Sequence, residues 1–153
     1  MDKKKKEGRY QRIYTQLEKL MNTCQDPEAR QASIIAVLHH KMDYFFWTGF
    51  YMLNKGDLIV ARYQGPIACM LLKKNVGVCW SAVNQSKTVI VEDVHEFPGH
   101  IACDSRSNSE IVVPLKDKSG EIIGVLDVDS SLLNSFDEID QIYLEKILEL
   151  IYI

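Results

Sequence analysis

The sequence predicts an α+β domain in which helices pack against a mostly antiparallel sheet. The expected elements run helix, helix, strands, short helix, strands, helix, and this order is typical of that architecture. No repeat, low-complexity tract or Pro/Gly-rich linker divides the 153 residues, a length that suits one core, and 46% hydrophobic content can fill it. We therefore expect one domain over residues 10–153, preceded by a flexible basic arm over residues 1–9.

Two helices are expected near the start of the chain. Apolar side chains three and four residues apart predict the first of them, over residues 10–21, and Asp26 followed by Pro27 predicts the N-cap and first turn of the second, which continues to about Lys41. The apolar positions of the first helix are Tyr10, Ile13, Tyr14, Leu17, Leu20 and Met21.

Strands and one short helix are expected in the middle of the chain. The aromatic run 45–53 and residues 58–64 read as two strands joined by turn residues 54–57, and a shorter helix is expected after Gly77. Residues 88–92, 110–115 and 121–129 read as further strands, with an irregular segment over 93–109. Ser135 and Glu138 have the spacing of a capping box, which predicts a last helix running nearly to the end.

Charge and cysteine usage narrow the classes of function. A formal net charge of −3 gives no overall attraction to nucleic acid or membrane, and the basic block at residues 3–6 reads as part of a solvated arm. No apolar run approaches the ~18 residues of a membrane helix, and no basic-then-apolar signal opens the chain, so we expect a cytoplasmic protein. Four cysteines would then be free thiols, transient disulfides or metal ligands.

The predicted strand 121–129 carries two carboxylates on one face. Side chains alternate along a strand, so Asp127 and Asp129 share a face with Ile123 and Val125 and stand roughly 7 Å apart. One interpretation is that both aspartates simply lean into water at the end of the strand. The other is a pocket that needs negative charge, or a carboxyl group with a raised pKa that can supply a proton.

The segment 47–51 places two large rings on one face of a strand. Trp47, Gly49 and Tyr51 alternate with the residues between them, and glycine weakens a strand unless a ligand or backbone comes close. Core packing explains this pattern equally well. The functional alternative is an aromatic slot for a small apolar or sulfur-containing group, because contacts between sulfur and aromatic rings are favourable.

Cys103 is the cysteine with the most reactive expected surroundings. It lies in the polar, irregular segment, near His95, His100, Asp104 and Arg106. Cationic neighbours stabilise a thiolate, and structural cysteines are usually buried in helices or strands. Cys103 is therefore a candidate nucleophile.

The remaining cysteines divide into two groups. Cys69 and Cys79 lie at or near predicted loops, whereas Cys24 lies near a helix end without polar company and is expected to be inert. Cys79 and Cys103, with the two histidines between them, form the pattern C-x15-H-x4-H-x2-C. Structural zinc sites usually have a closely spaced pair of ligands at each end, and Cys79 has no near partner, so we expect no metal.

Several segments together resemble the free methionine-R-sulfoxide reductase family. The similarity runs from about Tyr10 to the end, and the long block around Cys103 is its most specific part. The resemblance implies a GAF-type domain converted to catalysis and favours a homodimer, and we expect no cofactor. The matching segments are WTGFY (47–51), YQGPIAC (63–69), GVC (77–79), DVHEFPGHIACDSRSNSEIVVPL (93–115) and GVLDVDS (124–130).

The resemblance also implies a role for each cysteine. Cys103 would attack the sulfoxide sulfur of free methionine-R-sulfoxide, release methionine and become a sulfenic acid. Cys69 would resolve that species as a disulfide, which thioredoxin would reduce by thiol exchange. Cys79 matches a further cysteine of the family and is an alternative resolving or recycling thiol.

Five more residues match the binding residues of the family. Trp47 and Tyr51 would line the methylthio end of the pocket, and Glu110, Asp127 and Asp129 match its acids. A carboxyl held in an apolar site can stay protonated and deliver a proton to the departing oxygen, and other carboxylates can bind the ammonium group of a free amino acid. A methionine within a polypeptide lacks that charge, so selectivity for the free amino acid follows.

One departure and two other functions remain. Trp80 stands where the family commonly has a smaller residue, and it either packs under the helix or covers the pocket. A non-catalytic GAF ligand sensor is the main alternative function, and a scaffolding protein is a third. Plain ligand binding leaves Cys69, Cys79 and Cys103 unexplained, and scaffolding explains neither these thiols nor the acids.

Overall fold

The computed structural model describes residues 1–100 and 103–152 and contains one five-stranded sheet. The strands are antiparallel to their neighbours and follow the order β2-β1-β5-β4-β3, so the expected antiparallel α+β fold is confirmed. The strands are β1 (Trp47–Asn54), β2 (Asp57–Gln64), β3 (Val89–Val91), β4 (Ser109–Lys116) and β5 (Ile122–Ser130).

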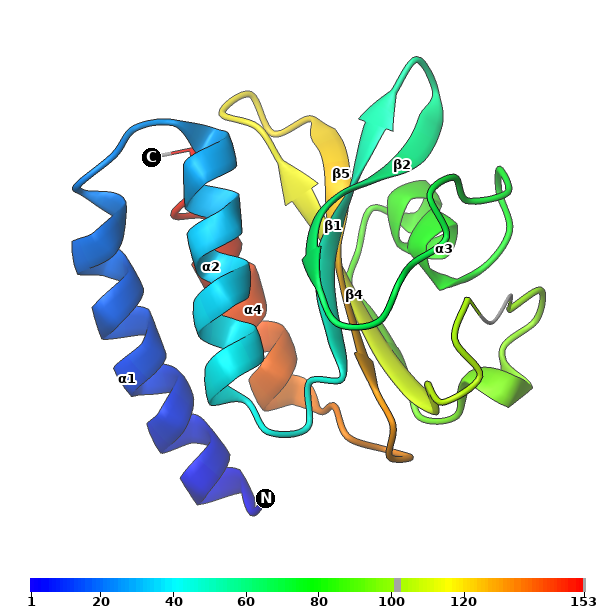
Figure 1. Cartoon of the computed structure of the whole chain (residues 1–153), viewed down its shortest axis with the longest axis horizontal. Helices are drawn as coiled ribbons and strands as arrows, with labels where there is room; N and C mark the ends of the chain where they lie inside the picture. Colours follow the sequence, from blue (N-terminus) through cyan, green and yellow to red (C-terminus); the bar gives the residue numbers. More distant parts are fainter. Residues whose placement is uncertain (101–102, 153) are drawn as a thin grey trace.

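Helices cover the two faces of the sheet unequally. Figure 1 shows the long helices on one side of the sheet, and the short α3 with connecting segments on the other. Each face has its own cluster of buried apolar side chains, and we call these faces the helical face and the α3 face. The helices are α1 (Lys3–Met21), α2 (Pro27–Lys41), α3 (Val78–Gln85) and α4 (Glu138–Leu148), with a short 3-10 turn, η1 (Val94–Glu96).

The flexible basic arm expected over residues 1–9 is not found, because α1 already begins at Lys3. The side chain of Asp2 caps it by accepting a hydrogen bond from the Lys5 backbone N–H at 2.8 Å. Lys6 is buried, and its ammonium group donates to Asp140 Oδ2 at 2.7 Å. The basic run predicted a solvated Lys6 because the partner that buries it, Asp140, lies 134 residues away in the sequence.

Capping explains where the other long helices begin. Asp26 accepts a hydrogen bond from the Ala29 backbone N–H at 2.9 Å, which confirms the predicted start of α2. The predicted capping box of Ser135 and Glu138 is wrong, because Asp137 and Asp140 form it instead. Both boxes have the required spacing, but the Ser135 hydroxyl donates to Ser130 Oγ at 2.7 Å and does not cap α4.

The register of the three central strands brings distant residues to one place. Asp129 on β5 lies opposite Trp47 on β1 and opposite Glu110 on β4, while Asp127 lies opposite Gly49. Gly49 is required by close packing: a Cβ there would lie 2.6 Å from Trp47 Cη2. The predicted face of β1 is therefore confirmed, and on β5 Val125, Asp127 and Asp129 point with it to the α3 face. Ile123 was expected on the same face, but it packs against the cluster of the helical face, because the pairing of β4 with β5 is irregular at Leu115/Lys116.

Among the described residues, no helix combines the length and the apolar character needed to cross a membrane.

Candidate active site

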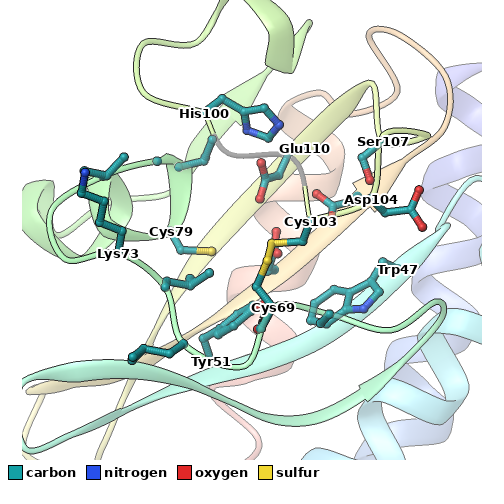
Figure 2. Close-up of a pocket in the computed structure, with 18 of the residues that line it drawn as sticks. Trp47, Tyr51, Cys69, Lys73, Cys79, His100, Cys103, Asp104, Ser107 and Glu110 are labelled. Carbon is teal, nitrogen blue, oxygen red and sulfur yellow. Dashed lines mark hydrogen bonds between the residues drawn. A yellow bond between two sulfur atoms is a disulfide. The ribbon is translucent and has the colours of Figure 1, made fainter.

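A cavity of about 110 Å³ lies on the α3 face, between the sheet and the segments that cross it. Its walls come from β1, β4 and β5, from the N-terminal end of α3, and from parts of residues 67–77, His100 and residues 103–107 (Figure 2). The structure thus brings together all eight residues that sequence analysis selected. They are Trp47, Tyr51, Cys69, Cys79, Cys103, Glu110, Asp127 and Asp129.

A disulfide bond joins Cys69 and Cys103 in the middle of this cavity (Figure 2). Their Cα atoms are 5.5 Å apart although 34 residues separate them in the sequence. Cys103 is exposed and Cys69 is half-buried, so solvent reaches the bond. In this form Cys103 Sγ is bonded to sulfur, so it is not a free thiolate that could bind a metal.

Two aromatic residues of β1 hold the loop that carries Cys69. Trp47 Nε1 donates to the carbonyl oxygen of Pro66 at 3.0 Å, and Tyr51 Oη donates to the carbonyl oxygen of Cys69 at 3.0 Å. The Trp47 ring also stacks on Tyr51 and Tyr63, with centroids 5.8 and 5.1 Å away. Trp47 and Tyr51 therefore combine packing with positioning of Cys69, a role that alternation along a strand could not reveal.

The three acids form a cluster at the floor of the cavity. Glu110 and Asp127 are 5% and 6% exposed, and Asp129 is half-buried beside them. Burial raises the pKa of all three, to about 6 for Asp127 and well above the usual range for the other two. Repulsion from Asp127 adds to the raised pKa of Glu110 and Asp129, which favours the protonated form of both carboxyl groups.

Cys79 lies against the same acids and points toward the disulfide in Figure 2. Burial raises the pKa of its thiol, and nearby Asp127 raises it further. Among the described residues, ligand atoms of Cys79, Glu110 and Asp127 form a set within 4.8 Å of one another, the spacing that could hold a cation. Asp127 Oδ1 is buried and has no hydrogen-bond partner among the described residues, so it can accept a hydrogen bond from a ligand.

The cationic side chains expected near Cys103 are mostly neutralised. His95 Nδ1 lies 2.8 Å from Asp93, and Arg106 pairs with Asp104 at 2.6 Å, which lowers the Asp104 pKa to about 2. His100 does line the cavity, and burial lowers its pKa. The surroundings of Cys103 are thus less cationic in this disulfide form than the sequence suggests.

Trp80 and Lys73 lie in and near α3, and only Lys73 lines the cavity. Trp80 is buried in the apolar cluster of the α3 face and does not line the cavity, so it packs under the helix rather than covering the pocket. Lys73 lines the rim of the cavity and was not selected from the sequence, where it is one of many lysines without a motif.

Comparison with known proteins identifies the family. A model of the GAF domain matches residues 26–153. The chain belongs to the GAF domain family. This GAF domain is 50% identical to GAF domain-containing protein A of Dictyostelium discoideum, over 99% of this chain and 95% of that protein.

Several relatives carry the name of an enzyme. The GAF domain is 44% identical to the free methionine-R-sulfoxide reductase of Escherichia coli, over 74% of this chain and 68% of the relative. It also superimposes on the free methionine-R-sulfoxide reductase of Neisseria meningitidis, solved with its substrate. That match has a TM-score of 0.87 and 41% identity, and covers 93% of this chain and 85% of the other.

Proposed function

We propose that this GAF domain reduces free methionine-R-sulfoxide to methionine. The observation that carries the proposal is the Cys69–Cys103 disulfide in a cavity whose floor is made of buried carboxyl groups. A thiol pair can supply two electrons, and carboxyl groups with a raised pKa can supply protons, which are the two requirements of sulfoxide reduction. The names of the relatives in E. coli and N. meningitidis support the same reaction.

The first step uses the reduced form of Cys103. Its thiolate attacks the sulfoxide sulfur, and the sulfur–oxygen bond of the substrate breaks with proton delivery. The oxygen ends on Cys103 Sγ, so methionine leaves and Cys103 becomes a sulfenic acid. The Cys69 thiol then attacks this sulfenic acid and releases water. The product is the disulfide seen in the structure, so one sulfoxide and two thiols give one sulfide, one disulfide and one water.

The acids are proposed to divide two tasks among them. One of Glu110, Asp127 and Asp129 stays protonated, because its pKa is raised by burial, and delivers a proton to the departing oxygen. An ionised neighbour binds the substrate's ammonium group, for which the unpartnered Asp127 Oδ1 is a suitable acceptor. Trp47 and Tyr51 line the cavity beside the disulfide and are proposed to contact the methylthio end.

Recycling and assembly complete the proposal. Thioredoxin is the proposed reductant of the Cys69–Cys103 disulfide, and Cys79 is an alternative recycling thiol because it lines the same cavity. A homodimer and a cytoplasmic location stay predictions that follow from the resemblance and the composition.

The nucleophile provides the decisive experiment. Incubating the reduced protein separately with free methionine-R-sulfoxide and methionine-S-sulfoxide should release methionine from the R form alone. Cys103→Ser should abolish release, because a hydroxyl is a far poorer nucleophile than a thiolate, while the exposed Cys24→Ser control keeps it. Binding of the sulfoxide without release of methionine would instead support a ligand sensor.

The resolving thiol is tested in a single turnover. Cys69→Ser should release about one methionine per protein and then stall, because the sulfenic acid forms and its main partner is missing. Trapping the sulfenic acid with dimedone and weighing the protein by mass spectrometry checks this. Thioredoxin-dependent turnover at the wild-type rate would transfer the resolving role to Cys79.

A further inference from the structure

Apolar side chains are unusually exposed next to the disulfide. We call Ile59, Ile67, Met70 and Leu71 the Cys69 patch; they are 36%, 84%, 76% and 60% exposed. Ile67 and Met70 are the two most exposed large apolar side chains in residues 1–100 and 103–152. Side chains of this kind cost free energy in water, so a cluster around a reactive bond indicates a contact surface.

The backbone holds this patch in place. The Val60 N–H donates to the carbonyl oxygen of Met70 at 2.9 Å, and the Leu72 N–H donates to the carbonyl oxygen of Leu58 at 3.1 Å. Ile59 and Leu71 form an antiparallel bridge, so the segment that follows Cys69 lies along the free edge of β2. The patch is therefore ordered rather than a loose loop, and its position relative to the disulfide is set.

The patch and the disulfide open in the same place. Ile67 and Leu71 line the cavity that contains Cys69 and Cys103, and Met70 follows Cys69 directly in the chain. Cys103 is exposed. A molecule that covers the patch is thus also placed against the sulfur–sulfur bond.

The size of the patch decides between two kinds of occupant. A stable dimer needs roughly 20–30 residues on each side, whereas redox encounters occupy the low end of interface sizes. Four apolar residues fit the second class. We propose that the Cys69 patch is the docking surface for a dithiol protein that reduces Cys69–Cys103, and this inference rests on the proposed function.

The thiol–disulfide exchange at this surface transfers two electrons from the partner to Cys69 and Cys103. A thiolate of the partner attacks one of the two bridging sulfurs, which forms a mixed disulfide and releases the other cysteine as a thiolate. The second thiol of the partner then attacks the mixed disulfide. The partner leaves as a disulfide, and Cys69 and Cys103 take up two electrons and two protons.

The test compares two reductants on the same bond. The oxidised protein is mixed with reduced thioredoxin or with dithiothreitol, and the appearance of the Cys69 and Cys103 thiols is followed over time. Met70→Glu should lower the second-order rate constant with thioredoxin by about 10-fold or more, since one apolar contact at a small interface commonly has this weight. The rate constant with dithiothreitol should change less than about 2-fold, because a small reductant does not use the patch.

Two further variants control for charge and shape. Ile142→Glu makes a comparable change at a 58% exposed side chain of α4, on the helical face, and should leave both rate constants unchanged. Met70→Leu keeps the apolar surface and should retain the thioredoxin rate.

Three outcomes would overturn the inference. They are an unchanged thioredoxin rate in Met70→Glu, an equal loss with both reductants, and a change in oligomeric state by light scattering, which would make the patch an interface between copies. Because this assay contains no methionine sulfoxide, its result is separate from the test of the proposed function.

Discussion

Both faces of the sheet bury charged groups, but in opposite ways. On the helical face, Asp140 accepts hydrogen bonds from Lys6 at 2.7 Å, from Tyr10 at 2.7 Å and from Tyr44 at 2.6 Å. The lysine supplies the opposite charge, and both carboxylate oxygens have donors. A buried charge with this many partners is a structural feature that joins α1 to α4.

The α3 face buries three acids without such a partner. In the described part of the chain, Glu110, Asp127 and Asp129 form no ion pair, and Asp127 Oδ1 has no donor. Crowding carboxyl groups in an apolar place costs free energy, which appears as their raised pKa. The cluster of the helical face, whose charges all have partners, stabilises the fold, whereas the unpaired acids of the α3 face are proposed to be kept for a ligand.

The largest expected effect is a loss of turnover when the acids of the α3 face are replaced by amides. Of Glu110→Gln, Asp127→Asn and Asp129→Asn, the variant that loses the proton donor should lower kcat by about 100- to 10,000-fold. A variant that loses the ammonium ligand should mainly raise KM. Steady-state kinetics with free methionine-R-sulfoxide separate the two effects, and near-normal kinetics in all three variants would place the active site elsewhere.

Asp140→Asn, on the helical face, should lower the free energy of unfolding and leave turnover unchanged. Removing one partner of a buried ion pair leaves Lys6 uncompensated, which costs about 3–5 kcal/mol of the free energy of unfolding. Urea denaturation measures this, and kcat per folded molecule should stay normal. The exposed pair of Lys3 and Glu138 is the matched control, because solvent screens it and Glu138→Gln should leave the free energy of unfolding almost unchanged. Equal losses in both variants would mean that the helical-face cluster is not structural.

The smallest expected effect is a pH-dependent gain in stability. Burial raises the Asp127 pKa from 3.8 to about 6, so the unfolded chain ionises first and the wild type loses stability as pH rises between these values. Asp127→Asn does not ionise. Its free energy of unfolding relative to wild type should therefore increase by about 1–3 kcal/mol between pH 4 and pH 7. A constant difference across that range would show that Asp127 does not carry this penalty.

Local patterns predicted the parts of the site that depend on one element. Alternation along a strand placed Trp47 with Tyr51 and Asp127 with Asp129, because the two-residue period needs no tertiary information. Two predicted helix starts, those of α2 and α4, show the limit of local patterns. Asp26-Pro27 marked α2 correctly, whereas the sequence before α4 offered two overlapping capping boxes, and tertiary bonds of Ser135 decided between them.

Features that depend on pairing over long distances could not be predicted from local patterns. The burial of Lys6 requires Asp140, and the contact of Glu110 with Asp129 requires the register of β4 on β5. The Cys69–Cys103 pairing came from resemblance to a family rather than from spacing. Each of these is a contact between residues far apart in the sequence.

The most direct test of the account asks whether the unpaired acids recognise the ammonium group. The ratio of kcat/KM for free methionine-R-sulfoxide to that for N-acetyl-methionine-R-sulfoxide should be large, because acetylation removes the positive charge and leaves the reacting sulfoxide intact. Loss of one charge-assisted hydrogen bond in a buried site corresponds to a factor of about 10–100. Equal kcat/KM values for the two compounds would contradict the claim that the acids of the α3 face are kept for a free amino acid.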